Sequence, residues 1–218
     1  LYLAINPAIQ YRHGFESINP KQQFLVSAGI NSRAIIGKKI GVQGVGQVGK
    51  YLINYLVKEG ADILITDIFE DKLKEVAAAT GATVVDSNLL YDMPMDIYAP
   101  CALGATINDQ TIDRLTCKVI AGGANNQLED EAKHGKILME KGIVYAPDFL
   151  INAGGLINVY SEVHGHSAKR AMEKTEHIYQ VTLEILKKSR EENIPTYEAA
   201  NKIAEKRIAD IRRIKAAY

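Results

Sequence analysis

The fold is decided by one stretch, Lys39-Ile40-Gly41-Val42-Gln43-Gly44-Val45-Gly46-Gln47-Val48-Gly49. Its apolar first half predicts a strand over 39–43. The spacing Gly44-x-Gly46-x-x-Gly49 then predicts a tight turn that opens into a helix. The helix is expected to end at Gly60, and its apolar face is predicted to carry Val48, Leu52, Leu56 and Val57.

A second apolar run at 62–66 predicts the next strand, and Asp67 follows it, 23 residues after Gly44. A strand, a glycine turn, a helix, a strand and then an acid are typical of a dinucleotide-binding unit. The pyrophosphate would lie at the helix N-terminus, where free N–H groups favour an anion. Asp67 would bind a ribose 2′-hydroxyl and repel a 2′-phosphate, so NAD is expected over NADP. The alternative is a glycine turn that only packs.

Six short apolar runs recur from residue 38 onward, at 39–43, 62–66, 82–85, 96–99, 118–121 and 143–146. Helical segments or turns separate them, which predicts an α/β fold with a doubly wound, mostly parallel, six-stranded Rossmann-type sheet. Residues 1–36 carry no readable element. We therefore expect an unassigned segment 1–36, a dinucleotide-binding domain 37–166, and C-terminal helices 167–218 that pack on it.

The C-terminal part reads as helical. One helix is predicted over 167–192, with a stripe made of Ala168, Ala171, Met172, Thr175, Ile178, Thr182, Ile185 and Leu186. Pro195 is expected to separate it from a last helix, which Thr196 would cap. The apolar seam of that last helix is predicted to consist of Ala200, Ile203, Ala204, Ile208 and Ile211.

Small residues and amides follow the later strands. The fourth run leads into Cys101 and Ala102, the fifth from Ala121 into Asn125 and Asn126, and Asn152 comes shortly after the sixth. Ligands of such sheets bind beyond the carboxyl ends of the strands, and an amide offers both a donor and an acceptor. Together these residues favour a binding site. Singly, Asn152 could cap a helix and Asn125 and Asn126 could form a turn.

Composition excludes several other classes. The 26 basic and 26 acidic residues balance, so no nucleic-acid partner is expected. No membrane span or signal peptide is recognisable. Cys101 and Cys117 read as reduced thiols of a cytoplasmic protein. His164 and His166 read as surface residues, Tyr145 and Tyr160 as packing residues, and no metal site is expected.

Several long segments resemble one family. They are Gly44-Val45-Gly46, Thr66-Asp67, 96–105, 120–128 and 151–159, and they are similar to the cofactor domain of the Glu/Leu/Phe/Val dehydrogenases, nearest the leucine dehydrogenase branch. The resemblance covers about residues 38–211. It implies NAD-dependent oxidative deamination of an amino acid, with leucine favoured, to a 2-oxo acid and ammonium.

The resemblance also implies roles for individual residues. The cofactor contacts would be Gly44, Val45, Gly46, Gln47, Val48, Gly49, Asp67, Cys101, Ala102, Ala121 and Asn125. The substrate contacts would be Asn126, Asn152, Leu156 and Val159, the last two forming a wall against an apolar side chain. In this family a separate N-terminal domain supplies a catalytic lysine from a glycine-rich stretch, and most of the oligomer contacts.

No GGGK-type stretch, in which a lysine follows consecutive glycines, occurs in these 218 residues, and the first residue is Leu1. We therefore expect no catalytic residue in this chain, a partner domain outside it, and a homo-oligomer for the intact protein. Two alternatives stay open. One is an NAD-binding module without catalytic activity, and the other is a phenylalanine or tryptophan dehydrogenase of the same family.

Overall fold

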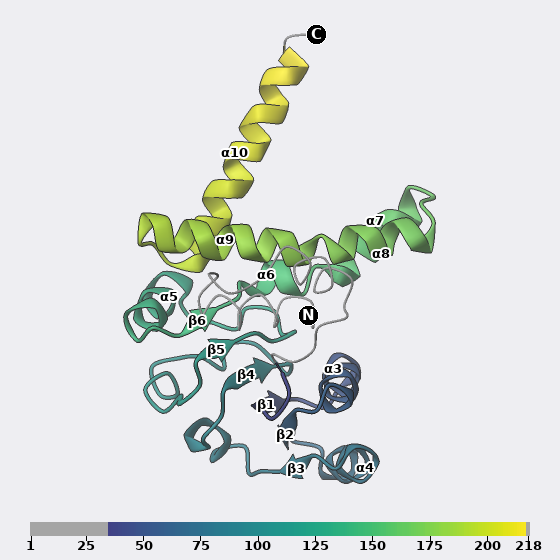
Figure 1. Cartoon of the computed structure of the whole chain (residues 1–218), viewed down its shortest axis with the longest axis vertical. Helices are drawn as coiled ribbons and strands as arrows, with labels where there is room; N and C mark the ends of the chain where they lie inside the picture. Colours follow the sequence, from purple (N-terminus) through teal and green to yellow (C-terminus); the bar gives the residue numbers. More distant parts are fainter. Residues whose placement is uncertain (1–34, 217–218) are drawn as a thin grey trace.

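The computed structural model describes residues 35–216, which form a six-stranded sheet. Figure 1 shows how the helices lie around it. In chain order the strands are β1 (Lys39–Gln43), β2 (Asp62–Thr66), β3 (Thr83–Val84), β4 (Ile97–Pro100), β5 (Val119–Ile120) and β6 (Val144–Tyr145). Their order in the sheet is β3-β2-β1-β4-β5-β6, and every pair is parallel. The predicted doubly wound Rossmann-type fold is therefore confirmed, with the order reversing between β1 and β4.

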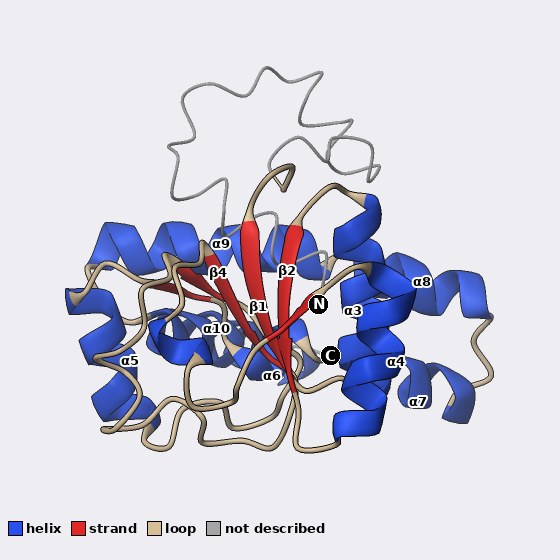
Figure 2. Ribbon diagram, turned by 90° about the horizontal axis from the view of Figure 1, so that it is seen from below, coloured by secondary structure: helices blue, strands red, loops and turns tan. Residues whose placement is uncertain are grey.

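Helices and turns cover both faces of the sheet (Figure 2). On one face α3 (Gln47–Lys58), α4 (Glu70–Thr80), α6 (Asp148–Ile151) and α9 (Ile178–Glu192) pack over Ile40, Val42 and Ile97. On the other, η3 (Leu90–Asp92), the segment 105–117 and α5 (Glu131–Glu140) pack over Tyr98 and Ile120. Alternate residues of one strand thus enter opposite cores, because successive side chains point to opposite faces.

The first two predicted strands have the bounds that the structure shows, and the other four differ by one residue at each end. Helix α3 buries Leu52 and Leu56 as expected, together with Ile53. The placement of Val48 on the packing face was wrong, since its side chain is 52% exposed. Val48 lies in the first turn of α3, close to Gly46, where a Cβ would meet no atom within 4 Å.

The predicted helix over 167–192 is instead two helices, α8 (Ala168–Glu176) and α9, which meet at His177. Helix α7 (Gly154–Val163) precedes them. Ala171, Ile178 and Leu186 are buried, whereas Met172 is exposed. Only part of the predicted stripe is therefore buried. The break explains why one continuous stripe was only partly right.

The last helix, α10 (Thr196–Ala216), leaves the body of the molecule (Figure 1). Its first turns bury Ala199 and Ala200 against α9, but Ile208 and Ile211 are exposed. The outer half of its apolar seam therefore has no cover within residues 35–216. The division at residue 166, with the later helices packing on the sheet domain, stays a prediction. Within the same residues, no helix combines the length and apolar character that crossing a membrane requires.

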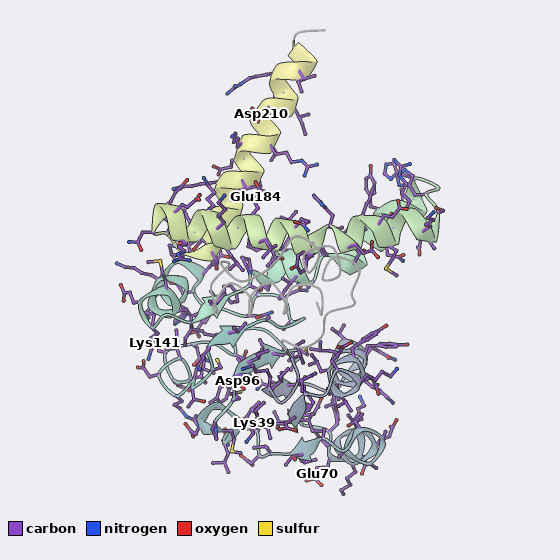
Figure 3. All side chains as sticks on the ribbon, viewed as in Figure 1. Lys39, Glu70, Asp96, Lys141, Glu184 and Asp210 are labelled. Atoms are coloured by element: carbon purple, nitrogen blue, oxygen red, sulfur yellow. The ribbon has the colours of Figure 1, made fainter. Side chains whose placement is uncertain are left out.

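Charged residues lie at the amino-terminal edge of the sheet, and Figure 3 labels two of them, Lys39 and Asp96. The N–H of Lys39 donates to Oδ2 of Asp96 at 3.1 Å, and Nζ of Lys38 lies 3.8 Å from Oδ1 of the same carboxylate. Both lysines are thus held at the edge opposite the carboxyl ends of the strands.

Gly122, directly beyond β5, permits a close approach of two strand ends. A Cβ there would lie 2.1 Å from the carbonyl oxygen of Pro100. We expect Gly122→Ala to lower the free energy of unfolding by about 1–3 kcal/mol, the usual effect of overpacking. Chemical denaturation measures this. The control is Gly155→Ala in α7, where a Cβ meets nothing within 4 Å, and an equal loss in both variants would contradict the argument.

Candidate functional site

The three glycines of the turn after β1 differ in what surrounds them. Gly44 has a φ of +101°, and a Cβ there would lie 2.7 Å from the N of Ala102. At Gly49 a Cβ would lie 2.0 Å from the carbonyl oxygen of Gly44. At Gly46 a Cβ meets nothing within 4 Å, and φ is −64°. Two glycines are therefore required by the fold, while the third leaves open space before the N-terminus of α3.

Asp67, directly after β2, accepts hydrogen bonds from the turn after β1 and from the turn after β2. Its Oδ2 accepts from the N–H of Val45 at 2.7 Å, and its Oδ1 accepts from the N–H of Phe69 at 3.1 Å. The N–H of Gly44 also donates to the carbonyl of Thr66 at 2.7 Å. The acid that the sequence analysis selected therefore lies directly beside the glycine turn.

Two hollows flank this pair of turns. One of about 200 Å³ is lined by Val45, Gly46, Gln47, Lys50, Lys72, Glu75 and Val76. The other, of about 300 Å³, is lined by Thr66, Asp67, Glu70, Leu73, Lys74, Val84, Val85, Asp86 and Ser87. A larger hollow of about 400 Å³ lies between α5, β6 and α9, and none of the predicted cofactor or substrate contacts lines it. The two hollows beside the glycine turn are the candidate cofactor site, since Gly46 lines one and Asp67 lines the other.

Two lysines with different partners line the first hollow. Nζ of Lys50 lies 2.5 Å from Oε1 of Glu75, and this hydrogen bond lowers the pKa of the Glu75 carboxyl. Nζ of Lys72 lies 4.4 Å from the centre of the Phe69 ring. The sequence does not indicate a role for Lys72 or Glu75, because nothing in their local pattern distinguishes them from a solvated helix face.

The end of β4 forms the second wall of the glycine turn. The N–H of Cys101 donates to the carbonyl of Gln43 at 2.7 Å. Burial raises the pKa of the Cys101 thiol to about 11, so the group is a neutral thiol at neutral pH. Cys101 and Cys117 are both free, as predicted. Ala121, the residue after β5, is fully buried, and Ala102 is exposed.

The structure brings two of the predicted amides together. Nδ2 of Asn152 donates to Oδ1 of Asn125, which joins the segment after α6 to the segment after β5. Asn152 ends α6, and Ala153 precedes α7, so the alternative that Asn152 caps α7 was wrong. Asn126 has a φ of +52°, and its carbonyl accepts from the N–H of Ala105 at 2.6 Å. The predicted turn at Asn125 and Asn126 is a bend of the backbone, and both residues are exposed.

The segment after β5 that carries Asn125 and Asn126 is held in place by two residues that were not predicted as site residues. Oδ2 of Asp148 accepts from the N–H of Gln127 at 2.9 Å. Nε2 of Gln127 donates to the carbonyls of Gly122 and Ala124, at 2.6 and 3.0 Å. Both side chains are buried. In the sequence, Gln127 and Asp148 could have been found by their position after the fifth and sixth predicted strands, near Asn126 and Asn152.

The remaining predicted residues lie on or near α7. Leu156 is 74% exposed and Val159 is 56% exposed, so the predicted apolar wall faces open space. Tyr145 is buried as predicted. The interpretation of Tyr160 as a packing residue was only partly right, because it is half-exposed and stacks on His164 with ring centres 4.1 Å apart. Within residues 35–216, no cluster of three or more His, Cys, Asp and Glu side chains could hold a metal ion.

Comparison with known proteins gives the family. The sequence profile of the Glutamate/Leucine/Phenylalanine/Valine dehydrogenases matches residues 65–216. Leucine dehydrogenase of Thermoactinomyces intermedius is 49% identical over 182 residues, which are 84% of this chain and 50% of that protein. L-tryptophan dehydrogenase of Nostoc punctiforme is 43% identical over 184 residues, 84% of this chain and 52% of that protein.

The structure of this chain is also similar to a solved one. The crystal structure of L-tryptophan dehydrogenase from Nostoc punctiforme superposes with a TM-score of 0.83 and 37% identity, covering 97% of this chain and 60% of that one. The chain spans about half the length of the curated relatives that it matches. On these matches, the chain belongs to the Glutamate/Leucine/Phenylalanine/Valine dehydrogenase family.

Proposed function

We propose that this chain is the NAD-binding part of an amino acid dehydrogenase. The whole protein would oxidatively deaminate a branched-chain L-amino acid, with leucine favoured, to its 2-oxo acid and ammonium. The observation that carries the proposal is the open space at Gly46, before the N-terminus of α3 and next to Asp67. An anion fits there, because the first N–H groups of a helix have no partners within the helix.

The cofactor would lie along the carboxyl edge of the sheet. Gly44, Val45, Gly46, Gln47, Val48 and Gly49 would hold its pyrophosphate, and Asp67 its adenine ribose. Cys101, Ala102, Ala121 and Asn125 would line the path toward its reactive end. When bound, NAD would accept a hydride from the substrate. The fit is supported by the lack of a side chain at Gly46 and by the two hollows, one lined by Gly46 and the other by Asp67.

The substrate would lie beyond the amide pair. The hydrogen bond from Asn152 to Asn125 fixes the orientation of both amides, which leaves the exposed Asn126 side chain to face the reacting group. Leu156 and Val159 would contact an aliphatic side chain, which favours leucine. A phenylalanine or tryptophan dehydrogenase is the alternative, and the tryptophan dehydrogenase relatives support keeping it.

The chemistry would need groups from outside this chain. The segments that directly follow β4, β5 and β6, at 101–117, 121–130 and 146–153, contain no lysine. We propose that a further domain of the same protein faces the exposed Leu156 and Val159, and that the intact protein is a cytoplasmic homo-oligomer. A module that binds NAD and catalyses nothing is the competing proposal.

The chain should bind NAD more tightly than NADP. A 2′-phosphate placed against Asp67 would meet a like charge, whereas a 2′-hydroxyl would donate a hydrogen bond to the carboxylate. We expect a preference of about tenfold or more, the usual scale for one charged hydrogen bond. Titration with both cofactors measures it, and Asp67→Ser should narrow the ratio. Equal or tighter binding of NADP would refute the role of Asp67.

A further inference from the structure

We infer that Asp67 has a second role: it holds the glycine turn in the shape that binds pyrophosphate, before any cofactor is present. This inference rests on the proposed function. It goes beyond ribose recognition, because it assigns to Asp67 an effect on a part of the cofactor that Asp67 would not touch.

Asp67 is hydrogen-bonded to Val45, which belongs to the glycine turn. Oδ2 of Asp67 accepts from the N–H of Val45 at 2.7 Å, a length typical of a charge-assisted hydrogen bond. Val45 is 3% exposed, and its N–H immediately precedes the open position at Gly46. The carboxylate therefore fixes the peptide that leads into the proposed pyrophosphate site.

A hydrogen bond within its own turn fixes the side chain of Asp67. Its Oδ1 accepts from the N–H of Phe69, two residues further on, which is a local turn that fixes the side chain. One carboxylate thus joins the turn after β1 to the turn after β2. The backbone bond from Gly44 to the carbonyl of Thr66 lies beside it, so two bonds connect the turns.

The glycine turn needs the hydrogen bond to Asp67 in order to keep one conformation. Gly44 has a φ of +101°, and a Cβ there would collide with the backbone of Cys101 and Ala102. A residue with this freedom is flexible unless neighbours fix it. Without an acceptor at Asp67, the N–H of the buried Val45 would lose its partner, and the turn would move to regain one.

Each oxygen of a carboxylate can accept more than one hydrogen bond. Asp67 can therefore keep its bond to Val45 while it accepts a ribose hydroxyl. Recognition of the adenine ribose and the shape of the pyrophosphate site would then depend on the same side chain, and a substitution of Asp67 should weaken both.

Inorganic pyrophosphate separates the two roles, because it has no ribose. We propose to titrate it into the wild-type chain, Asp67→Ala and Asp67→Asn, following the amide resonances of Gly46 and Gln47, and to measure hydrogen exchange at the amide of Val45 in each free chain. The asparagine side chain is neutral but keeps an acceptor oxygen, so Asp67→Asn tests whether an oxygen alone at this position holds the turn.

We expect exchange at Val45 to rise about tenfold in Asp67→Ala, and pyrophosphate binding to weaken by about the same factor, the scale of one hydrogen bond to a charged group. Asp67→Asn should keep most of the protection and bind pyrophosphate at least as tightly as wild type. If only the loss of the negative charge mattered, Asp67→Ala and Asp67→Asn would both bind pyrophosphate more tightly than wild type. Weaker binding by Asp67→Ala than by Asp67→Asn is therefore the decisive result.

The control is Asp130→Ala, which removes a carboxylate that accepts from the N–H of Lys133 at 2.9 Å at the start of α5. Val45 exchange should not change there. If the wild-type chain binds pyrophosphate and Asp67→Ala binds it equally well, the inference is overturned while the proposed function stands. If wild type does not bind pyrophosphate at the turn, both are overturned.

Discussion

Gly46→Val is expected to fold and to lose NAD binding. A valine side chain at this position would occupy the open space before α3 and keep a pyrophosphate from the backbone N–H groups. Losing one or two hydrogen bonds to a charged group corresponds to a decrease in affinity of about a hundredfold or more. The fold should survive, because φ at Gly46 is −64° and no atom lies within 4 Å of the added Cβ.

The measurement is titration of NADH fluorescence, with circular dichroism and chemical denaturation to verify the fold. Replacing a glycine before a helix by valine is expected to lower stability by about 1 kcal/mol. The matched control is Gly49→Val, where the added Cβ would lie 2.0 Å from the carbonyl oxygen of Gly44, and the fold itself should be damaged. Normal NAD binding by Gly46→Val would show that the turn is only structural.

The sheet could be predicted from the sequence because its strands are short apolar runs between turn residues. The bounds of β1 and β2 were right, since each is followed at once by a residue with a distinct role, Gly44 and Asp67. Strands β5 and β6 are two residues long, and hydrogen bonding to neighbouring strands decides where they end. Local sequence carries little information about that pairing.

The helices show a different limit. Periodicity identifies an apolar face but does not say which neighbour covers it. Leu186 and Ile211 both lie on apolar faces, yet Leu186 is fully buried and Ile211 is 46% exposed. The break at His177 was also missed, because the apolar spacing continues through it.

In the candidate site, the glycines could be predicted because a tight turn restricts backbone conformation, and only glycine fits at Gly44 and Gly49. The bonds from Val45 to Asp67 and from Asn152 to Asn125 could not be predicted. Each joins residues more than 20 positions apart, and their partners are fixed by the sheet order. Sequence spacing indicated that these residues gather at one edge, but not which of them bond.

The 218-residue chain by itself is expected to show little or no turnover of leucine with NAD. Removal of the proton from the substrate amine and activation of water need a base near the reacting carbon, and the developing charge needs a cation. The lysines closest in sequence to the glycine turn do not follow β4, β5 or β6, where the reacting groups would lie. Lys38 and Lys39 lie at the opposite edge of the sheet, and Lys50 is paired with Glu75.

The measurement is the absorbance of NADH with leucine, valine, isoleucine and phenylalanine as substrates. Lack of a general acid–base group alone lowers a rate by about 10²–10⁴-fold, and loss of substrate orientation adds to this. As a second arm, the part of Thermoactinomyces intermedius leucine dehydrogenase that has no counterpart in this chain would be supplied separately.

Turnover that appears only with the added part would identify this chain as the cofactor half of a two-part enzyme, because neither half alone would contain both the glycine turn and the catalytic groups. Gly46→Val provides the control, since it should stay inactive in the mixture. Turnover by the isolated chain near the rate of an intact dehydrogenase would instead place the catalytic groups within these residues. The exposed amide of Asn126 and the segment around it would then be the first place to look for them.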